Sequence, residues 1–186
     1  KLMNGVNTAD TFESVLSLVR QQCDDVDLLV LTGDLCHEPT QQNYDRLFAT
    51  LDDVDIPFIA IPGNHDVTLE LDNHLPFAQR RHLPVKADTR LQNCHSIATD
   101  YWDLLLLDSS CEGHSHGKID EQTLRWLAQQ LANAHHPCAI FCHHPMVLID
   151  STWLDEYTLI NADRFWEVVM PYLDRIKAIF VGHIHQ

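Results

Sequence analysis

Four apolar segments of this chain each end in side chains that commonly bind metal ions. A run of Val, Ile, Leu and Phe closed by Gly or Pro predicts a buried strand whose C-terminal end lies at the rim of a sheet. Ligands and catalytic groups gather at that rim in open α/β sheets. If the four strands are neighbours, their ends bring two carboxylates, one carboxamide and up to five imidazoles together, which fits a pair of divalent cations. The segments are LVLTGD, ending at Asp34; FIAIPGNHD, ending at Asn64, His65 and Asp66; AIFCHHP, with His143 and His144; and AIFVGHIH, with His183 and His185.

Hydrophobic periodicity alternates between strand and helix along the chain. Apolar residues at helical spacing, such as Phe12, Leu16 and Val19, favour helices, and Thr8 is the expected N-cap of the first one. With 186 residues of which 45% are hydrophobic, the chain can bury one substantial core. We therefore expect a single domain over residues 1–186, with an α/β fold built on a mixed sheet or two packed sheets. The predicted helices are 8–23, 40–51, 69–81, 120–132 and 161–173; the predicted strands are 28–31, 58–61, 95–98, 104–107, 139–141 and 176–181; and residues 84–93 are a predicted loop.

The composition is strongly acidic, with 12 Lys and Arg residues against 27 Asp and Glu residues and a formal net charge of -15. This balance argues against a nucleic acid polymer as partner, because neutralisation of phosphates by Lys and Arg supplies most of the affinity for such polymers. A small phosphate compound held through metal ions is compatible with it. No apolar run approaches the roughly 18 residues of a membrane span, so no membrane partner is expected. The sequence leaves the oligomeric state open.

The six cysteines are scattered, without the close pairing of a zinc ribbon or a disulfide scaffold. We expect them to be reduced and mostly structural, which favours a cytoplasmic protein. Cys142 precedes His143, and successive strand residues point to opposite faces, so its thiol should turn away from any metal bound by that histidine. The cysteines are Cys23, Cys36, Cys94, Cys111, Cys138 and Cys142.

The residue types at the four strand ends suit metal binding. Gly33 permits a sharp turn, after which the short carboxylate of Asp34 can face inward and bridge two ions. Asn64 offers a neutral carbonyl oxygen, which keeps a metal electrophilic, and His65 points into the space beyond. His183 and His185 share a face if their segment is extended. His144 is the less favoured ligand of its pair, since its direction alternates with that of His143.

Each motif taken alone also has an ordinary structural interpretation. A GD or GNHD sequence after a strand is often a turn, because Asn and Asp are favoured turn residues. Only the joint occurrence of all four motifs in this order supports a metal site. His114 and His116, in the loop CEGHSHG, are candidates for the rim of the pocket. The remaining histidines are expected to be surface groups: His37, His74, His82, His95, His135 and His136.

The motifs TGDL, PGNHD, HHP and GHIHQ resemble those of the calcineurin-like metallophosphoesterases, whose pattern is DxH, GD, GNH, H and GHxH. The resemblance is closer still to the bacterial class III cyclic nucleotide phosphodiesterases, the cyclic AMP phosphodiesterase group. The segments that carry this closer resemblance are GVNTAD at residues 5–10, LLLLDS at 104–109, HGKID at 116–120 and STWLDEYTLINAD at 151–163.

The resemblance implies an αββα sandwich with mixed sheets and a role for each matched residue. Asp34 would bridge two divalent metal ions, such as Mn2+, iron as Fe2+ or Fe3+, or Zn2+. His65 would contact the phosphate and protonate the leaving oxygen, while a metal-bridging hydroxide attacks phosphorus. The implied reaction is hydrolysis of a cyclic nucleotide, foremost 3',5'-cyclic AMP to 5'-AMP. One site would be completed by Asn64, His143 and His183, and His185 would belong to the other.

Two alternatives stay open at the level of sequence. One is a broader phosphodiesterase or phosphomonoesterase acting on another small phosphate compound, since a metal pair recognises phosphate and leaves the organic group to the surrounding loops. The other is a noncatalytic metal-binding module. His65 argues against this second alternative, because a purely structural site would not need an imidazole that is not a ligand.

The chain also departs from the family pattern. The opening DxH, which supplies an Asp and a His to the first metal, has no counterpart here, and the chain stops at Gln186 where the family continues. We therefore expect an incomplete domain, truncated at both ends. Of the matched set, the first metal retains Asp34 and His185, so binding of both metals and activity of this fragment stay open.

The segment from Ser151 to Asn161 leaves the HHP motif through a loop, so we expect it to lie over the metal pocket and outside the core. Trp153 there has no helical or strand pattern. It either stacks on a nucleotide base or anchors the loop, and Asn161 is expected to assist substrate binding more weakly.

Overall fold

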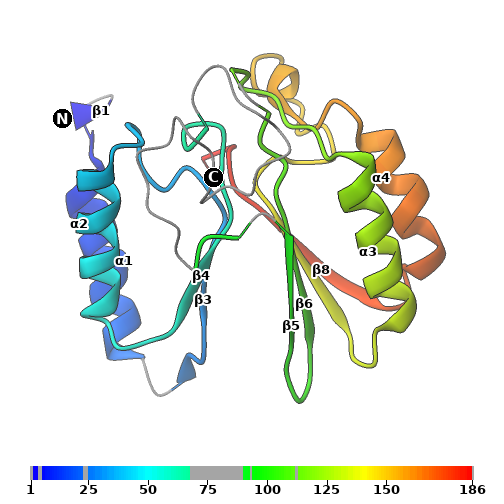
Figure 1. The fold of residues 1–186 in the computed structure, drawn as a ribbon. Coiled ribbons are helices and arrows are strands. Elements are labelled where there is room, and N and C mark those ends of the chain that lie inside the picture. Colours follow the sequence, from blue (N-terminus) through cyan, green and yellow to red (C-terminus); the bar gives the residue numbers. More distant parts are fainter. Residues whose placement is uncertain are drawn as a thin grey trace.

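A computed structural model describes residues 2–3, 6–22, 25–67, 90–92, 94–111 and 113–185. Two sheets face each other at the centre, and a pair of helices covers the outer face of each (Figure 1). Apolar side chains from both sheets form the central layer, among them Ile59, Ile61 and Leu106. The arrangement is the expected αββα sandwich.

A small parallel sheet with two covering helices forms the first half of the sandwich. Strand β3 pairs in parallel with β4, with Leu29 opposite Phe58. Leu16, Tyr44 and Phe48 from the helices are buried against this sheet. The elements are β1 Leu2–Met3 and β2 Val6–Asn7, which pair antiparallel, followed by α1 Thr8–Gln21, β3 Leu29–Leu31, α2 Gln41–Asp52 and β4 Phe58–Ala60.

A four-stranded mixed sheet in the order β5-β6-β7-β8 forms the second half. Strands β5 and β6 pair antiparallel as a hairpin, whereas β6, β7 and β8 run parallel to one another. Leu124, Leu127 and Leu131 occupy one face of α3 and are buried against the sheet. The elements are β5 Cys94–Ala98, β6 Asp103–Leu107, α3 Glu121–Asn133, β7 Cys138–Cys142, the 3-10 helix η3 Leu154–Tyr157, α4 Ala162–Val169, the 3-10 helix η4 Met170–Tyr172 and β8 Ile176–Val181.

Side-chain caps fix the helix starts. The side chain of Asp120 caps α3, and that of Thr40 caps α2. The cap of α1 is Asn7, whose Oδ1 accepts a hydrogen bond from the amide of Ala9, so the predicted cap Thr8 is instead the first helical residue. Asn7 has the extended backbone that a cap requires.

Proline shortens the last helix. The predicted helix at 161–173 is α-helical only to Val169 and continues as η4, which has Pro171 in its first turn. Proline lacks the amide hydrogen that an α-helix interior needs. The predicted helix at 69–81 lies outside the described residues, as does most of the predicted loop at 84–93, of which Leu91 bridges to Ala60.

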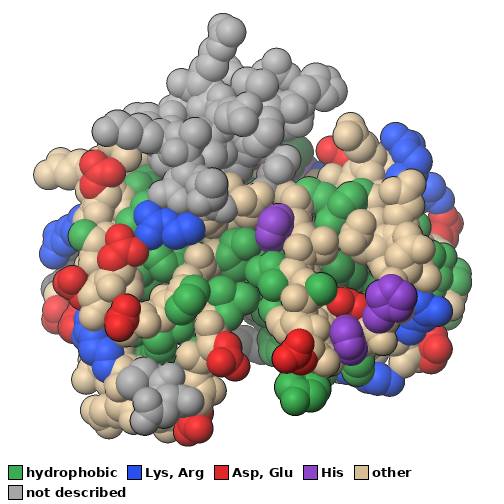
Figure 2. All heavy atoms as spheres, turned by 60° about the horizontal axis from the view of Figure 1, so that its bottom comes forward, with side chains coloured by type: hydrophobic (Ala, Val, Ile, Leu, Met, Phe, Trp, Pro, Cys, Tyr) green, Lys and Arg blue, Asp and Glu red, His purple; other side chains and the backbone are tan. Residues whose placement is uncertain are grey.

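Figure 2 shows hydrophobic side chains reaching the surface in the middle of one face, with charged side chains on both flanks. Among the exposed apolar residues are Tyr101 and Trp102, in the turn that joins β5 to β6. That turn lies at the edge opposite the C-terminal ends of β6, β7 and β8, because these three strands run parallel. Among the described helices, none has the length and apolar character needed to span a membrane.

Candidate metal centre

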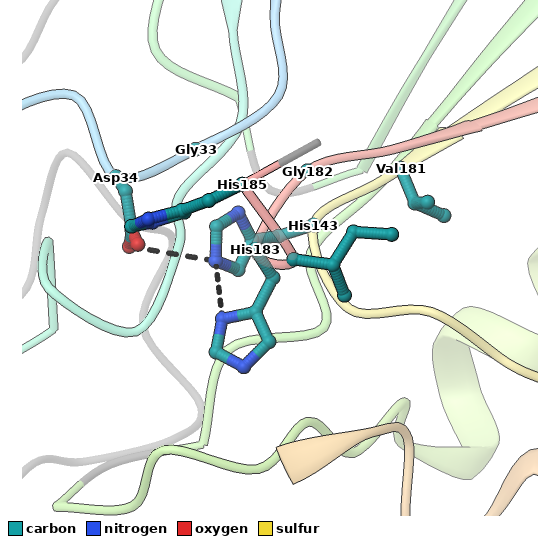
Figure 3. Close-up of a pocket in the computed structure, with 8 residues that line it drawn as sticks. Gly33, Asp34, His143, Val181, Gly182, His183 and His185 are labelled. Atoms are coloured by element: carbon teal, nitrogen blue, oxygen red, sulfur yellow. Dashed lines mark hydrogen bonds and ion pairs between the residues drawn. The ribbon is translucent and has the colours of Figure 1, made fainter. Parts of the chain in front are cut away.

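The four predicted motifs meet in one place, where β3, β4, β7 and β8 end. A pocket of about 360 Å³ opens there, between the two sheets (Figure 3). The amide of Gly182 donates to the carbonyl of His143, which keeps the segments that leave β7 and β8 together. The pocket is lined by Gly33, Asp34, His143, Val181, Gly182, His183, Ile184 and His185.

Tight backbone contact brings the segments after β3 and β4 together. Gly33 has φ +96, and a Cβ there would lie 2.5 Å from the amide nitrogen of Gly63. A Cβ on Gly63 would lie 2.3 Å from Oδ1 of Asp34. Only glycine at both positions allows this approach, which places the carboxylate of Asp34 beside the segment that carries Asn64.

Three of the predicted ligands have left-handed backbone conformations. Asp34 has φ 52, His183 has φ 67 and His185 has φ 51. Each such residue costs on the order of 1–3 kcal/mol and persists only where the surrounding structure imposes it. Because His183 is not extended, the sequence argument that placed His183 and His185 on one face of a strand does not describe the observed backbone.

His143 lies at the centre of the cluster and is buried. Its Nδ1 donates to the carbonyl oxygen of Thr32 at 2.7 Å, so its Nε2 carries the lone pair in the neutral ring. Around Nε2 stand Oδ1 of Asn64 at 3.2 Å, Nδ1 of His183 at 3.2 Å and Oδ1 of Asp34 at 3.4 Å. Figure 3 marks the contacts of His143 with Asp34 and His183.

The donor chemistry of this cluster fits a cation. When His143 is neutral with its hydrogen on Nδ1, a carboxylate oxygen, an amide oxygen and two imidazole nitrogens point their lone pairs at one another. A positive ion among them would turn this repulsion into attraction. Nε2 of His183 is buried without a hydrogen-bond partner. Carboxylate, amide and imidazole ligands without sulfur suit a divalent first-row metal.

Charge interactions hold Asp34 and His183 in the forms that bind metals, whereas His143, whose pKa is raised, gives up a proton when it binds a metal ion. Burial acts to raise the pKa of Asp34, but the hydrogen bond and the charge of His143 outweigh it and lower that pKa to about 2. Burial acts to lower the pKa of His143, whereas its hydrogen bond to Asp34 raises it above the ordinary value. Burial and the charge of His143 lower the pKa of His183 to about 4, so this ring is neutral near pH 7.

The remaining predicted residues of the centre lie at its exposed side. The amide of His65 donates to Oδ1 of Asp34 at 2.9 Å, while its exposed ring lies 4.9 Å from the ring of His37. His185 is exposed and lines the pocket beside Asp34 (Figure 3). His65 is thus tied to the proposed bridging carboxylate through its backbone, which leaves its imidazole free of that contact.

His144 is buried directly beneath the cluster, with ring centroids 4.8 Å from those of His143 and His183. Its Nδ1 accepts from the hydroxyl of Ser109 at 2.8 Å, and its Nε2 donates to the carbonyl of Ser115 at 3.2 Å. Both ring nitrogens are therefore engaged. A nitrogen of His144 lies within 4.8 Å of ligand atoms of His143 and His183. Because both of its ring nitrogens are hydrogen-bonded, we interpret His144 as a residue that packs against these two histidines and not as a ligand.

Asp66 does not join the pocket, although it belongs to the ligand cluster that the sequence indicates. Its carboxylate is buried and accepts hydrogen bonds from backbone amides, including those of Gly63 and Leu35. The sequence predicted two carboxylates in the ligand cluster, and the structure places only one there, that of Asp34. His114 and His116 stack on each other, with ring centroids 4.6 Å apart, and neither lines the pocket.

The segment from Ser151 to Asn161 borders the centre through a residue that the sequence did not single out. The ring of Tyr157 lies 6.5 Å from that of His183, and Trp153, 67% exposed, lies 6.0 Å from Tyr157. The segment is not wholly outside the core, since Leu159 is buried between α3, α4 and the sheet. A tyrosine in a polar loop carries no periodic signal, so only the fold places Tyr157 here.

The side chain of Asn161 is engaged at both polar atoms. Oδ1 accepts from the amide of Ile119 at 3.1 Å, and Nδ2 donates to the carbonyl of Ile119 at 2.7 Å. This pair of bonds ties the start of α4 to the segment before α3. We therefore leave Asn161 out of the proposed substrate-binding residues.

Comparison with known proteins gives a consistent picture. A model of the calcineurin-like phosphoesterase family matches residues 6–186. A probable cyclic nucleotide phosphodiesterase of Psychrobacter arcticus is 39% identical over 176 residues, covering 95% of this chain and 63% of the relative. One of Psychrobacter sp. (strain PRwf-1) is 40% identical, covering 95% and 52%. The 3',5'-cyclic adenosine monophosphate phosphodiesterase of Escherichia coli K12 is 32% identical, covering 98% and 62%.

Solved structures agree on the fold. A dimetal phosphatase from Danio rerio superposes with a TM-score of 0.69 at 15% identity, covering 95% of this chain and 72% of the other. A purple acid phosphatase from yellow lupin superposes with a TM-score of 0.68 at 14% identity, covering 91% and 32%. The chain spans 52–63% of the length of the curated relatives quoted above.

Proposed function

The chain belongs to the calcineurin-like phosphoesterase family, and from that premise we propose that the whole protein is a metal-dependent phosphodiesterase that hydrolyses a cyclic nucleotide. The leading substrate is 3',5'-cyclic AMP. The names of the relatives from Psychrobacter and Escherichia coli support this substrate class. The observation that carries the metal dependence is the convergence of Asp34, Asn64 and His183 on the lone pair of His143.

We propose that this cluster holds one of two divalent cations, and that Asp34 and His185 contribute to the other. When bound, the cations would activate a water molecule as nucleophile and neutralise charge on the phosphoryl oxygens. The chain prepares this site in two ways. It keeps the Asp34 carboxylate ionised, and it presents Nε2 of His143 by fixing the opposite nitrogen on the Thr32 carbonyl. A fixed tautomer of this kind orients the imidazole and strengthens it as a ligand.

His65 is the proposed contact for the phosphate and the proton donor to the leaving oxygen. Its backbone amide is fixed on the Asp34 carboxylate, so the residue is held at the mouth of the pocket while its exposed ring can meet a substrate. Removal of the ring by His65→Ala should lower turnover by a factor on the order of 100 or more, the usual scale for a general acid. The variant should bind Mn2+ as the wild type does. Loss of Mn2+ with unchanged turnover per bound ion would show that His65 is a ligand instead.

Trp153 is the proposed contact for the base. It stands at the exposed end of a row of rings that continues through Tyr157 to His183, so a nucleotide whose phosphate lies in the pocket can reach it. Stacking of a base on an aromatic side chain contributes about 1–3 kcal/mol. Trp153→Ala should therefore raise the Michaelis constant for 3',5'-cyclic AMP by roughly tenfold and change hydrolysis of a generic aryl phosphodiester little. Equal losses on both substrates would point to a collapsed loop.

The proposed function is tested by incubating the protein with Mn2+ and either 3',5'-cyclic AMP or an aryl phosphodiester. Hydrolysis of both, with loss of activity and bound Mn2+ together in Asp34→Asn, is the expected result. Hydrolysis of the aryl diester alone would favour a broader phosphodiesterase. Binding of Mn2+ without hydrolysis of either compound would favour a noncatalytic module. Turnover that persists in Asp34→Asn after removal of metal would contradict the proposed function altogether.

A further inference from the structure

We propose that Tyr44 and Asp66 form a buried brace that sets the spacing between the segments carrying Asp34 and Asn64, and that they act as positioning residues for the cation site. This inference rests on the proposed function for the identity of the site. The brace itself follows from contacts between side chains and backbone that involve no metal.

Asp66 joins three separate pieces of the chain. Its carboxylate accepts from the amide of Gly63 at 2.9 Å, from the amide of Leu35 at 3.0 and 3.1 Å, and from the amide of Cys36 at 3.3 Å. It also accepts from the hydroxyl of Tyr44 at 2.5 Å. Both carboxylate oxygens are engaged, and the residue is fully buried.

The bonded amides are immediate neighbours of the proposed ligands. Leu35 follows Asp34 in the chain, and Gly63 precedes Asn64. A shift of the Asp66 carboxylate therefore moves the backbone on which both ligands stand. The contact between Gly33 and Gly63 leaves no room for a Cβ, so the two segments have little freedom to compensate.

The hydroxyl of Tyr44 holds the Asp66 carboxylate from the side of α2. It lies in α2, is fully buried and packs edge-on against Phe48, so the position of its hydroxyl is fixed by the core of the first sheet. Burial and the charge of Asp66 raise the pKa of Tyr44, which keeps its proton and makes it the donor. The position of α2 therefore fixes the Asp66 carboxylate, and through it the backbone beside Asp34 and Asn64.

Tyr44→Phe is the most informative variant, because it removes the donor and keeps the ring. Asp66→Asn would place an amide N–H among backbone donors and is expected to compromise folding, so it is the weaker test. Loss of a partner that bonds a metal ligand directly commonly lowers metal affinity by about 10–100-fold, and Tyr44 acts on the ligands less directly, through Asp66 and the backbone. We expect Tyr44→Phe to weaken Mn2+ binding by about tenfold, at the lower end of that range, because the amides of Gly63 and Leu35 still hold Asp66.

The matched control is Leu51→Val. Leu51 lies on the same buried face of α2, two turns further along, and its side chain has no polar atom. The substitution removes one methylene group from the same core and alters no hydrogen bond to Asp66. The full chain of the wild type and of both variants would be titrated with Mn2+, and amide hydrogen exchange at Leu35, Cys36 and Gly63 would be measured without metal.

The expected result is faster exchange at these three amides and weaker Mn2+ binding in Tyr44→Phe, with the affinity of Leu51→Val unchanged. Unchanged exchange in Tyr44→Phe would overturn the brace. Equal loss of Mn2+ affinity in both variants would reduce Tyr44 to an ordinary core residue. Absence of Mn2+ binding by the wild type would overturn the proposed function and with it the positioning role, while the exchange rates would still report separately on the brace.

Discussion

Asp34 illustrates how the backbone imposes chemistry on one side chain. It follows Gly33, adopts a left-handed conformation itself and accepts a hydrogen bond from the amide of His65. These constraints aim its carboxylate at His143, whose hydrogen bond and charge lower the pKa of Asp34 to about 2 despite its burial. The carboxylate is therefore ionised throughout the range in which a divalent cation would bind.

Gly63→Ala tests the close approach of the two ligand-bearing segments. The added Cβ would lie 2.3 Å from Oδ1 of Asp34 and 2.4 Å from its amide nitrogen, so the backbone must move. We expect a loss of about 3 kcal/mol in the free energy of unfolding, measured with urea, the scale of overpacking in a tight site. Gly182→Ala is the matched control, since its Cβ would find its nearest neighbour at 3.1 Å. Similar losses in the two variants would contradict this explanation.

The thiol of Cys94 tests the electrostatics of the second sheet. Burial, together with the charges of Asp120 and Asp108, raises its pKa from 9.0 to about 12. At pH 9 an unfolded thiol is about half ionised, whereas the native Cys94 stays almost wholly protonated. Alkylation of Cys94 by iodoacetamide at pH 9, followed by peptide mass analysis, should accelerate at least tenfold on unfolding in urea. Equal rates in native and unfolded protein would contradict the raised pKa.

At the scale of elements, the sequence predicts what local rules determine. The apolar face of α3 and its cap at Asp120 follow from helical spacing and side-chain chemistry, and both are observed. The strands that lead to the ligands were also recognisable, because each is a short apolar run closed by Gly or Pro. Local rules could not predict the direction in which each side chain points. Asp66 is a plausible ligand by sequence, yet it faces the backbone amides of Gly63 in its own turn and of Leu35 in the segment after β3.

Long-range contacts decided the other differences as well. Both polar atoms of Asn161 bond to Ile119, 42 residues away in sequence. Tyr157 borders His183 only because the segment after β7 folds back over the end of β8. Neither contact follows from periodicity or from motif spacing. The αββα arrangement came from the family resemblance, whereas periodicity alone indicated an α/β domain without a unique sheet arrangement.

Leu127→Ala tests whether α3 supports the second sheet. Leu127 is fully buried in the core between α3, α4 and the sheet, so truncation removes contacts and leaves a cavity. We expect a loss of about 2–5 kcal/mol in the free energy of unfolding in urea. Gln129→Ala, at an exposed position of the same helix, should change it by less than about 0.5 kcal/mol. A small effect at Leu127 would mean that the helix contributes little to the stability of the sheet.

At the scale of the whole molecule, the candidate centre lies between the two sheets. Asp34 and Asn64 follow β3 and β4 of one sheet, whereas His143 and His183 follow β7 and β8 of the other. A cation bound by all four side chains would therefore link the two halves of the sandwich. Stability and metal binding should be coupled, because an ion that binds only the folded protein favours it by mass action.

This coupling predicts a metal-dependent stability. Free Mn2+ at about 100 times its dissociation constant should add about 2.7 kcal/mol to the free energy of unfolding, and a chelator should remove the gain. His143→Ala should show no such gain, because it deletes the side chain on which the other three converge. An equal gain in wild type and variant would place the stabilising ion elsewhere.

The position of a bound ion tests the central claim most directly. Crystals of the protein grown with Mn2+ would be measured at the manganese absorption edge, where anomalous scattering locates the metal. We predict a peak in contact with Asp34, Asn64, His143 and His183, with both ring nitrogens of His144 still bonded to Ser109 and Ser115. A peak held instead by His143, His144 and His183, or no peak at the ends of these strands, would contradict the proposed site.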